Sequence, residues 1–247
     1  IYSVANAQHT FGQRPFRAPH HTASAIALVG GGSQPKPGEI TLAHLGVLFL
    51  DELPEFDRKV LEVLRQPLES KEIVISRAAR QMTFPANFQF IAAMNPCPCG
   101  YAFNQDSRCQ CSPESIQRYQ NRISGPLLDR IDLHIDVPPL QANELQERTP
   151  SENSETVRQR VMKAYQQQIQ RQQCLNQALS PTLLEQYACL DDSSSKIIEM
   201  AQQRLNLSAR AYHRVLRVAR TIADLAESEI ISSSHLTEAL SYRGHST

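Results

Sequence analysis

The chain has 247 residues, of which 41% are hydrophobic, so it can bury one large core or a large core and a smaller one. Its 25 Lys and Arg side chains balance its 25 Asp and Glu side chains, which excludes a global field that attracts nucleic acid, an acidic partner or a membrane. The longest apolar runs, 25–29 and 46–50, are far shorter than the ~18 residues of a membrane span. Four of the six cysteines cluster in one segment, unlike a secreted disulfide framework, so we expect a cytoplasmic protein.

Three short apolar runs, 47–50, 88–94 and 131–137, predict β-strands. The first two are continuously apolar, which is typical of strands in a parallel sheet that are buried on both faces. The third alternates with polar residues and suits a strand nearer an edge. Between the first two, apolar residues recur at helical spacing over 58–67. The order strand, helix, strand predicts an α/β fold with a parallel sheet.

Two insertions precede the core strands. The runs 26–29 and 39–42 flank a tract rich in Gly and Pro, which predicts two strands joined by a mobile tip. The runs 72–76 and 81–84 flank Arg77-Ala-Ala-Arg80 and predict a second β-hairpin.

The composition changes after Pro138-Pro139. We expect an α/β core over 1–140, a linker over 141–154 that contains Pro150, and an all-helical domain over 155–247. Five helices are predicted there, at 155–173, 181–187, 193–205, 209–226 and 234–241.

Two acids, Asp51 and Glu52, directly follow the first apolar strand. Burying charge at a strand end is costly unless the charge has a role. In P-loop ATPases the first such acid holds the Mg²⁺ shell and the second polarises the attacking water. The alternative is a strand that runs out into a solvated loop.

Two further residues suit the same chemistry. Asn95 ends the next apolar strand and would emerge beside Asp51 if the two strands are neighbours, although an Asn before Pro also commonly starts a turn. Arg130 precedes the third run, where it could neutralise transition-state charge across a subunit interface. The alternative is a salt bridge with Asp129 or Asp132, which is the commoner role of a surface arginine beside acids.

Four cysteines, Cys97, Cys99, Cys109 and Cys111, form two close pairs separated by a polar loop. This is sufficient for a tetrahedral, structural Zn²⁺ site, although the C-x-C spacing is tighter than usual and four free thiols are the alternative. His20 and His21 suit pocket or packing positions better than ligand positions.

Four long motifs, 11–24, 46–56, 92–100 and 124–133, resemble those of the magnesium-chelatase-like AAA+ ATPases, and in particular a bacterial competence subfamily. The resemblance covers essentially the whole chain. It implies a P-loop-type α/β core with hairpin insertions and a helical lid, assembled as a hexameric ring that uses ATP and Mg²⁺.

The resemblance also implies roles for single residues. Asp51 and Glu52 match the Walker B pair, Asn95 matches sensor 1, and Arg130 matches the arginine finger that acts on the neighbouring subunit's nucleotide. Arg210 fits the lid arginine called sensor 2, with Arg214 as the alternative on the same helical face.

The family's phosphate-binding loop is not found in this sequence, since Gly30-Gly-Gly-Ser33 has no Lys and suits no strand-to-helix turn. In the family that loop lies upstream of the position of Ile1. We therefore expect the isolated chain to bind ATP weakly or not at all.

The subfamily resemblance further implies DNA as a partner, through branch migration. The two insertions of the family point into the ring's pore, so Lys36, Arg77 and Arg80 would face a threaded strand and bind phosphate without reading sequence. Solvated turn charges are the alternative. Two other functions stay open: the ATPase subunit of a magnesium chelatase, and a non-catalytic fragment that keeps assembly or DNA-binding surfaces.

Overall fold

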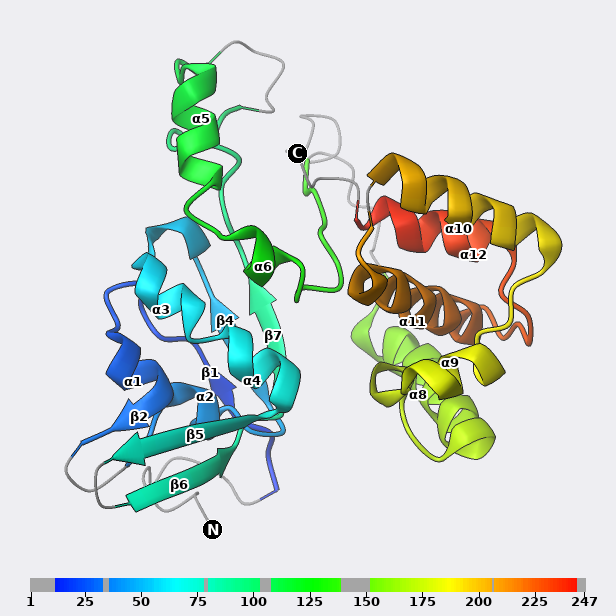
Figure 1. Ribbon diagram of the computed structural model, residues 1–247, viewed down its shortest axis with the longest axis horizontal. Helices are drawn as coiled ribbons and strands as arrows, with labels where there is room; N and C mark the ends of the chain where they lie inside the picture. The colour runs from blue at the N-terminus through cyan, green and yellow to red at the C-terminus, as the bar shows by residue number, and fades with distance from the viewer. Residues whose placement is uncertain are drawn as a thin grey trace. The chain divides into compact units, whose positions relative to one another are not determined.

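The computed structural model describes residues 12–32, 36–77, 80–102, 108–138, 152–205 and 207–243, with the backbone alone at 77, 80 and 205 (Figure 1). Two compact units divide the chain, 1–131 and 132–247. The first is a mixed α/β unit and the second is all-helical, which confirms the predicted fold class.

The centre of the first unit is a parallel sheet of three strands in the order β1-β4-β7. These are β1 (Phe16–Arg17), β4 (Val47–Leu50) and β7 (Gln89–Ala92). The ladder pairs Leu50 with Ala92, so the two predicted apolar strands are neighbours, which is the condition for Asn95 to emerge beside Asp51. Gly46 lets β1 approach β4 closely, because a Cβ at this position would overlap Pro15, whose carbonyl accepts the N–H of Val47.

The prediction that the strands are buried on both faces is wrong. Leu48 and Leu50 are fully buried in the core of the unit, whereas Phe16 is 62% exposed and Ile91 is 44% exposed. The core on the buried face contains apolar side chains of four helices, α1 to α4. These helices cover one face of the sheet, so only alternate residues of β4 are buried.

The helix predicted over 58–67 forms as two shorter helices, α3 (Arg58–Glu62) and α4 (Arg65–Ser70). Asp57 caps α3 by accepting the N–H of Lys59 at 2.7 Å. Pro67 has no N–H to donate to the carbonyl of Val63, one turn earlier. A single continuous helix would need this hydrogen bond, so α3 ends at Glu62 and α4 begins at Arg65.

The first insertion differs from the predicted pair of long strands. Its apolar runs are helices, α1 (Ala25–Val29) and α2 (Glu39–Leu42), and they enclose a minimal hairpin of β2 (Gly30–Gly31) and β3 (Lys36–Pro37). Ser24 caps α1 through the N–H of Ala27, and helical turns bury Leu28 and Ile40 in the core of the unit.

A bidentate ion pair ties this insertion to the sheet. Arg17 on β1 donates to both carboxylate oxygens of Glu39 on α2, at 2.5 and 2.7 Å. The pair is about four-fifths buried, and its hydrogen bonding raises the pKa of Arg17.

The second predicted hairpin is confirmed as β5 (Glu72–Arg77) and β6 (Arg80–Pro85), which run antiparallel. Its base is anchored because Ile73, Ile75 and Phe84 are buried in the core of the first unit. The ladder extends to the pair Arg77 and Arg80, so the tip is very short.

The chain then forms α5 (Pro113–Gln120) and α6 (Gly125–Leu128). The third strand, predicted over 131–137, does not form in this segment. Ile135 and Val137 are 65% and 87% exposed, so alternation here does not bury an apolar face. His134 belongs to the second unit, within which its backbone N–H donates to the carbonyl of Tyr242.

The second unit confirms all five predicted helices, each within one residue at either end. They are α8 (Ser154–Gln172), α9 (Pro181–Tyr187), α10 (Asp192–Leu205), α11 (Ala209–Leu225) and α12 (Ser233–Ser241), with a 3₁₀ turn, η3 (Asn176–Ala178). Most of the predicted linker lies outside the described residues. Within the described part of the chain, every helix is too short or too polar to cross a membrane.

Candidate active site

The carboxyl ends of β4 and β7 bring three predicted residues to one edge of the sheet. Asp51 and Glu52 follow β4, and Asn95 follows β7 by three residues. The two strand ends stay paired, since Ala93 donates to the carbonyl of Leu50 and accepts the N–H of Leu53, both at 2.9 Å. All three side chains are exposed to solvent. Neighbouring parallel strands thus gather a carboxylate pair and an amide at the edge where α/β proteins commonly bind ligands.

A sharp turn fixes the two acids. Asp51 accepts the backbone N–H of Glu52 through Oδ1 at 2.9 Å. Glu52 adopts the left-handed conformation with φ 53° and ψ 47°, which costs a residue with a side chain roughly 1 kcal/mol. The next segment is the 3₁₀ turn η2 (Leu53–Glu55), in which Leu53 and Pro54 are buried. This buried anchor offsets the strain and holds the turn.

The structure places His21 against Glu52, a contact that the sequence analysis missed. His21 Nδ1 lies 3.1 Å from Glu52 Oε2. The His21 ring lies 4.0 Å from the ring of His20, and its other neighbour is the ring of Phe56, seen edge-on at 6.4 Å. A signal was present: His21 closely follows β1, and β1 is parallel to β4, so both strands deliver residues to the same edge.

These groups suit metal-assisted phosphoryl transfer to water. Carboxylate oxygens are the ligands that Mg²⁺ prefers, and a second carboxylate can orient or deprotonate a water. The exposure of Asp51 and Glu52 makes both accessible to a hydrated cation. Gly30 to Gly32 do not form a phosphate cradle of the strand-to-helix kind, because Gly30 follows the helix α1 and enters the hairpin of β2 and β3.

Arg130 lies just after α6 and makes an ion pair within its own unit. Its Nη2 lies 2.6 Å from Glu69 Oε2 on α4, and its Nη1 donates to the carbonyl of Pro126 at 2.5 Å. The side chain is only 9% exposed. Arg130 therefore makes a salt bridge, which is the alternative role, but its partner is Glu69. Asp132, one of the two acids expected as its partner, pairs with Arg214 instead.

The lid arginines differ in exposure, which bears on the choice between Arg210 and Arg214. Arg214 is 11% exposed and donates to Asp132 at 2.6 Å. Arg217 donates to the carbonyl of Leu179, and burial lowers its pKa. Arg210, near the start of α11, is exposed. Arg210 is the better placed of the two to contact a ligand, and its role as sensor 2 stays a prediction.

The hairpin cations lie as follows. Lys36 is exposed on β3. Arg77 and Arg80 form the last pair of the second hairpin's ladder, and the structure describes only their backbone. Their role in binding DNA stays a prediction.

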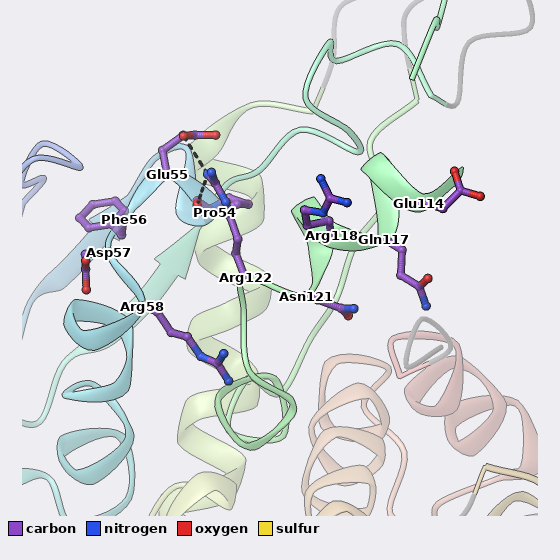
Figure 2. Close-up of a pocket in the computed structure, with 10 residues that line it drawn as sticks. All are labelled: Pro54, Glu55, Phe56, Asp57, Arg58, Glu114, Gln117, Arg118, Asn121 and Arg122. Carbon is purple, nitrogen blue, oxygen red and sulfur yellow. Dashed lines mark hydrogen bonds and ion pairs between the residues drawn. The ribbon is translucent and has the colours of Figure 1, made fainter. Parts of the chain in front are cut away.

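A charged cavity of about 650 Å³ lies between η2 and α5 (Figure 2). Arg122 bridges its walls by donating to Glu55 Oε2 and to the carbonyl of Pro54, both at 3.0 Å (Figure 2). The residues that line it are Pro54, Glu55, Phe56, Asp57, Arg58, Glu114, Gln117, Arg118, Asn121 and Arg122. Three arginines face three acids, so the lining is balanced in charge, and Asp51, Glu52 and Asn95 are not part of it.

The four clustered cysteines converge beyond Asn95. The Sγ atoms of Cys97, Cys99, Cys109 and Cys111 all lie within 4.8 Å of one another. Cys97 is buried and Cys99 is exposed. A backbone hydrogen bond from Tyr101 lowers the pKa of Cys99 to about 6, and hydrogen bonding with Cys99 raises the pKa of Cys111 to about 12. The sequence pattern thus corresponds to a real side-chain cluster.

Family models match nearly the whole chain. Residues 1–145 match the model described as magnesium chelatase, subunit ChlI, and residues 151–243 match the C-terminal model of the same subunit.

Curated relatives agree with this assignment. The chain is 54% identical over 95% of its length to the competence protein ComM of Haemophilus influenzae, and 49% identical over 98% to the protein YifB of Escherichia coli. A magnesium-chelatase 38 kDa subunit of Acidiphilium rubrum is 24% identical over 85% of the chain. These alignments cover 46%, 48% and 55% of the relatives, so the chain spans about half their length. The chain belongs to the magnesium chelatase ChlI family, whose AAA+ fold it shares.

Proposed function

We propose that this chain is part of an ATP-hydrolysing motor that acts on DNA. The observation that carries the proposal is the gathering of Asp51, Glu52 and Asn95 at the carboxyl edge of two neighbouring parallel strands in a chain of the ChlI family. Phosphoryl transfer needs positioned charge more than covalent chemistry, and this edge supplies it.

Each residue has a distinct task in the proposed reaction. Asp51 would hold the hydrated Mg²⁺, which neutralises charge on the phosphates when bound. Glu52 orients the attacking water and accepts its proton, with His21 fixing the direction of the carboxylate from 3.1 Å. Asn95 donates from its amide to the water or to the terminal phosphate.

Assembly into a ring would bring Arg130 to the nucleotide of a neighbouring subunit. In the isolated chain Arg130 pairs with Glu69, so assembly has to exchange this ion pair for the charge of the phosphate. A bidentate contact with phosphate is a stronger partner for a guanidinium than one carboxylate oxygen, so the exchange is physically reasonable. We propose a hexamer on the basis of the family resemblance.

Sequence identity to the relatives favours a function on DNA over that of a magnesium chelatase subunit. A protein named for competence is 54% identical to this chain, whereas a protein named as a magnesium chelatase subunit is 24% identical. The second hairpin presents two arginines at a very short tip. Cations at such a tip bind phosphates of any sequence.

The deciding experiment is an ATPase assay with and without DNA, on a version of the protein that includes a phosphate-binding loop. We expect DNA to stimulate hydrolysis, and the stimulation to weaken as salt rises. Hydrolysis that ignores DNA would favour the magnesium chelatase function. No hydrolysis in any condition would favour a non-catalytic role in assembly or DNA binding.

The double variant Arg77→Ala with Arg80→Ala tests the hairpin. We expect it to lower DNA stimulation several-fold. The slope of log K for DNA binding against log salt concentration should also become shallower by about 2, one for each phosphate contact removed. Basal hydrolysis without DNA should not change. The measurements are DNA-dependent hydrolysis rates and fluorescence anisotropy of a labelled strand over a salt series.

A matched control removes two exposed cations elsewhere. Arg158 on α8 and Lys196 on α10 are exposed, and the variant Arg158→Ala with Lys196→Ala changes the net charge equally. Equal losses of DNA stimulation in both double variants would show a general charge effect and contradict a role for the hairpin.

A further inference from the structure

The segment between β7 and α6 raises a question of stability that its apolar residues do not answer. It contains α5, an eight-residue helix in which Tyr119 is the buried residue. A helix this short is marginal in water, and the burial of one side chain adds little to its stability. Figure 1 shows α5 extending away from the central sheet of the first unit. The burial of Ile123 and the hydrogen bonds of Gln120 and Arg122 hold the C-terminal end of α5, so the question concerns what holds its N-terminal end.

The four cysteines lie at both ends of the connection that α5 follows. Cys97 and Cys99 come two and four residues after Asn95. Cys109 and Cys111 come three residues and one residue before Ser112, which caps α5 through the N–H of Ser115. Any bond that joins the two cysteine pairs would therefore fasten the start of α5 to the end of β7.

The distances between the sulfur atoms match a metal site. Three of the six are 3.3 Å between Cys97 and Cys99, 3.8 Å between Cys97 and Cys109, and 3.6 Å between Cys99 and Cys109. The distances to Cys111 are within 4.8 Å. A tetrahedron with Zn–S bonds of ~2.3 Å has edges of about 3.8 Å. A disulfide needs ~2.05 Å, and it joins two sulfurs rather than four. The mutual spacing of all four sulfurs thus favours a shared central cation.

Backbone groups surround the sulfurs as they do around bound thiolates. Hydrogen bonds from the backbone reach three of the four: Tyr101 to Cys99, Cys111 to Cys109, and Cys99 to Cys111. Such outer contacts orient metal ligands and stabilise the negative charge that four thiolates carry.

We infer that Cys97, Cys99, Cys109 and Cys111 bind one structural Zn²⁺ ion, which fastens α5 to the segment that carries Asn95. Soft thiolate ligands in a tetrahedral set select Zn²⁺ over the hard cations Mg²⁺ and Ca²⁺. Four protein ligands leave no open position, so this ion has a structural role and is separate from the Mg²⁺ of the proposed hydrolysis.

The site has a mechanical consequence for the edge of the sheet. The hydroxyl of Tyr119 has a backbone hydrogen bond with Asn95, and Gln120 donates from Nε2 to the carbonyl of Pro96 at 3.2 Å. The end of α5 thus contacts the Asn95 segment directly, and the metal fixes the other end of the same connection. Loss of the ion should loosen Asn95 without disturbing the helical unit.

The test begins with metal analysis of the chain purified without added chelator. We expect one zinc per chain, and replacement by Co²⁺ should give the absorption spectrum of a tetrahedral tetrathiolate site. Protein free of metal with four rapidly alkylated thiols would overturn the inference. Bound iron would also contradict it, as would disulfides detected by mass within the cluster.

Paired cysteine variants separate the cluster from the other thiols. Cys109→Ser with Cys111→Ser should reduce bound zinc from one equivalent to none, whereas Cys174→Ser with Cys189→Ser, outside the cluster, should leave it unchanged. If the first variant does not fold, stepwise thiol modification of the unmodified chain gives the same information, because zinc release should track the loss of cluster thiols alone. Release that tracks Cys174 or Cys189 would contradict the site.

Amide hydrogen exchange tests the mechanical consequence independently of ATP. Removing zinc with a chelator should speed exchange in 93–97 and in α5 at least tenfold, and leave α8 to α12 unchanged. Exchange rates in 93–97 and α5 that are the same before and after chelation would show that the metal does not hold this segment. Neither readout depends on hydrolysis or DNA, so failure here would leave the proposed function untouched.

Discussion

Replacing Asp224 by Ala is expected to destabilise the helical unit by about 3–5 kcal/mol, the usual result of removing one partner of a buried ion pair. Asp224 is 1% exposed on α11. Its carboxylate accepts from Arg171 at 2.6 and 3.0 Å, from Arg220 at 3.1 Å, and from Asn176 at 2.8 Å. The variant would leave Arg220 and Asn176 buried beside an empty space, whereas Arg171, which is 26% exposed, could turn to water.

Arg220 makes the consequence more severe. It is 1% exposed, and it donates to the carbonyls of Ser228 and Glu229 as well as to Asp224, which joins the end of α11 to the turn before α12. Burial lowers the pKa of Arg220, and the nearby Asp224 opposes this effect. Without Asp224 the guanidinium keeps its charge but loses its counter-ion.

The measurement is urea unfolding followed by circular dichroism, with hydrogen exchange to assign the transition to α8–α12. Glu199→Ala is the matched control, because Glu199 is an exposed acid on α10 of the same unit. We expect the control to change stability by less than about 0.5 kcal/mol. A loss below ~1 kcal/mol for Asp224→Ala would mean that the network contributes little to the fold.

Local sequence patterns predicted the elements whose determinants are local. The helices of the second unit have clear caps and periodicity, as in Asn153 before α8 and Ser180 before α9, and their ends were predicted within one residue. The second hairpin was predicted because its turn is short and its strands are rich in β-branched and aromatic residues.

The first insertion shows where such patterns fail. Its apolar runs are four or five residues long, and runs of this length fit a strand or a buried helical turn equally well. Packing decided the outcome: Leu28 and Ile40 are fully buried in the core when the runs are helical. The prediction of a strand over 131–137 failed for a different reason. Alternating apolar and polar residues form a strand only where another strand lies beside them to pair with.

The site was predictable to the extent that it depends on parallel strands. Asp51 and Asn95 follow neighbouring strands, so their shared edge could be deduced from the sequence. The edge shared by His21 and Glu52 would have followed in the same way had β1 been predicted, but a strand of two residues leaves no periodicity to find it by. The contact of Glu69 with Arg130 could not be deduced, because it joins segments far apart in the chain through side-chain geometry. Periodicity and spacing carry no information about such pairs.

Glu52→Gln is expected to lower DNA-stimulated ATP hydrolysis by about 10²–10⁴-fold, the usual contribution of a positioned general base. The amide has nearly the shape of the carboxylate and can still hydrogen-bond with His21, so the left-handed turn at Glu52 should persist. What is lost is the capacity to take a proton from water. ATP and DNA binding should therefore change little while the rate collapses.

Two comparisons make this result specific to the base. Glu55→Gln changes an exposed acid three residues away, which pairs with Arg122, and it should retain most of the rate. His21→Ala keeps the carboxylate but removes its orienting partner, so we expect a smaller loss of rate, seen in kcat rather than in KM. His21→Asn should partly restore the rate. Steady-state rates in a version with a phosphate-binding loop, alongside equilibrium binding of ATP, check all three. If Glu52→Gln and Glu55→Gln behaved alike, the acid at the end of β4 would not be the base, and the proposed hydrolysis site would have to be abandoned.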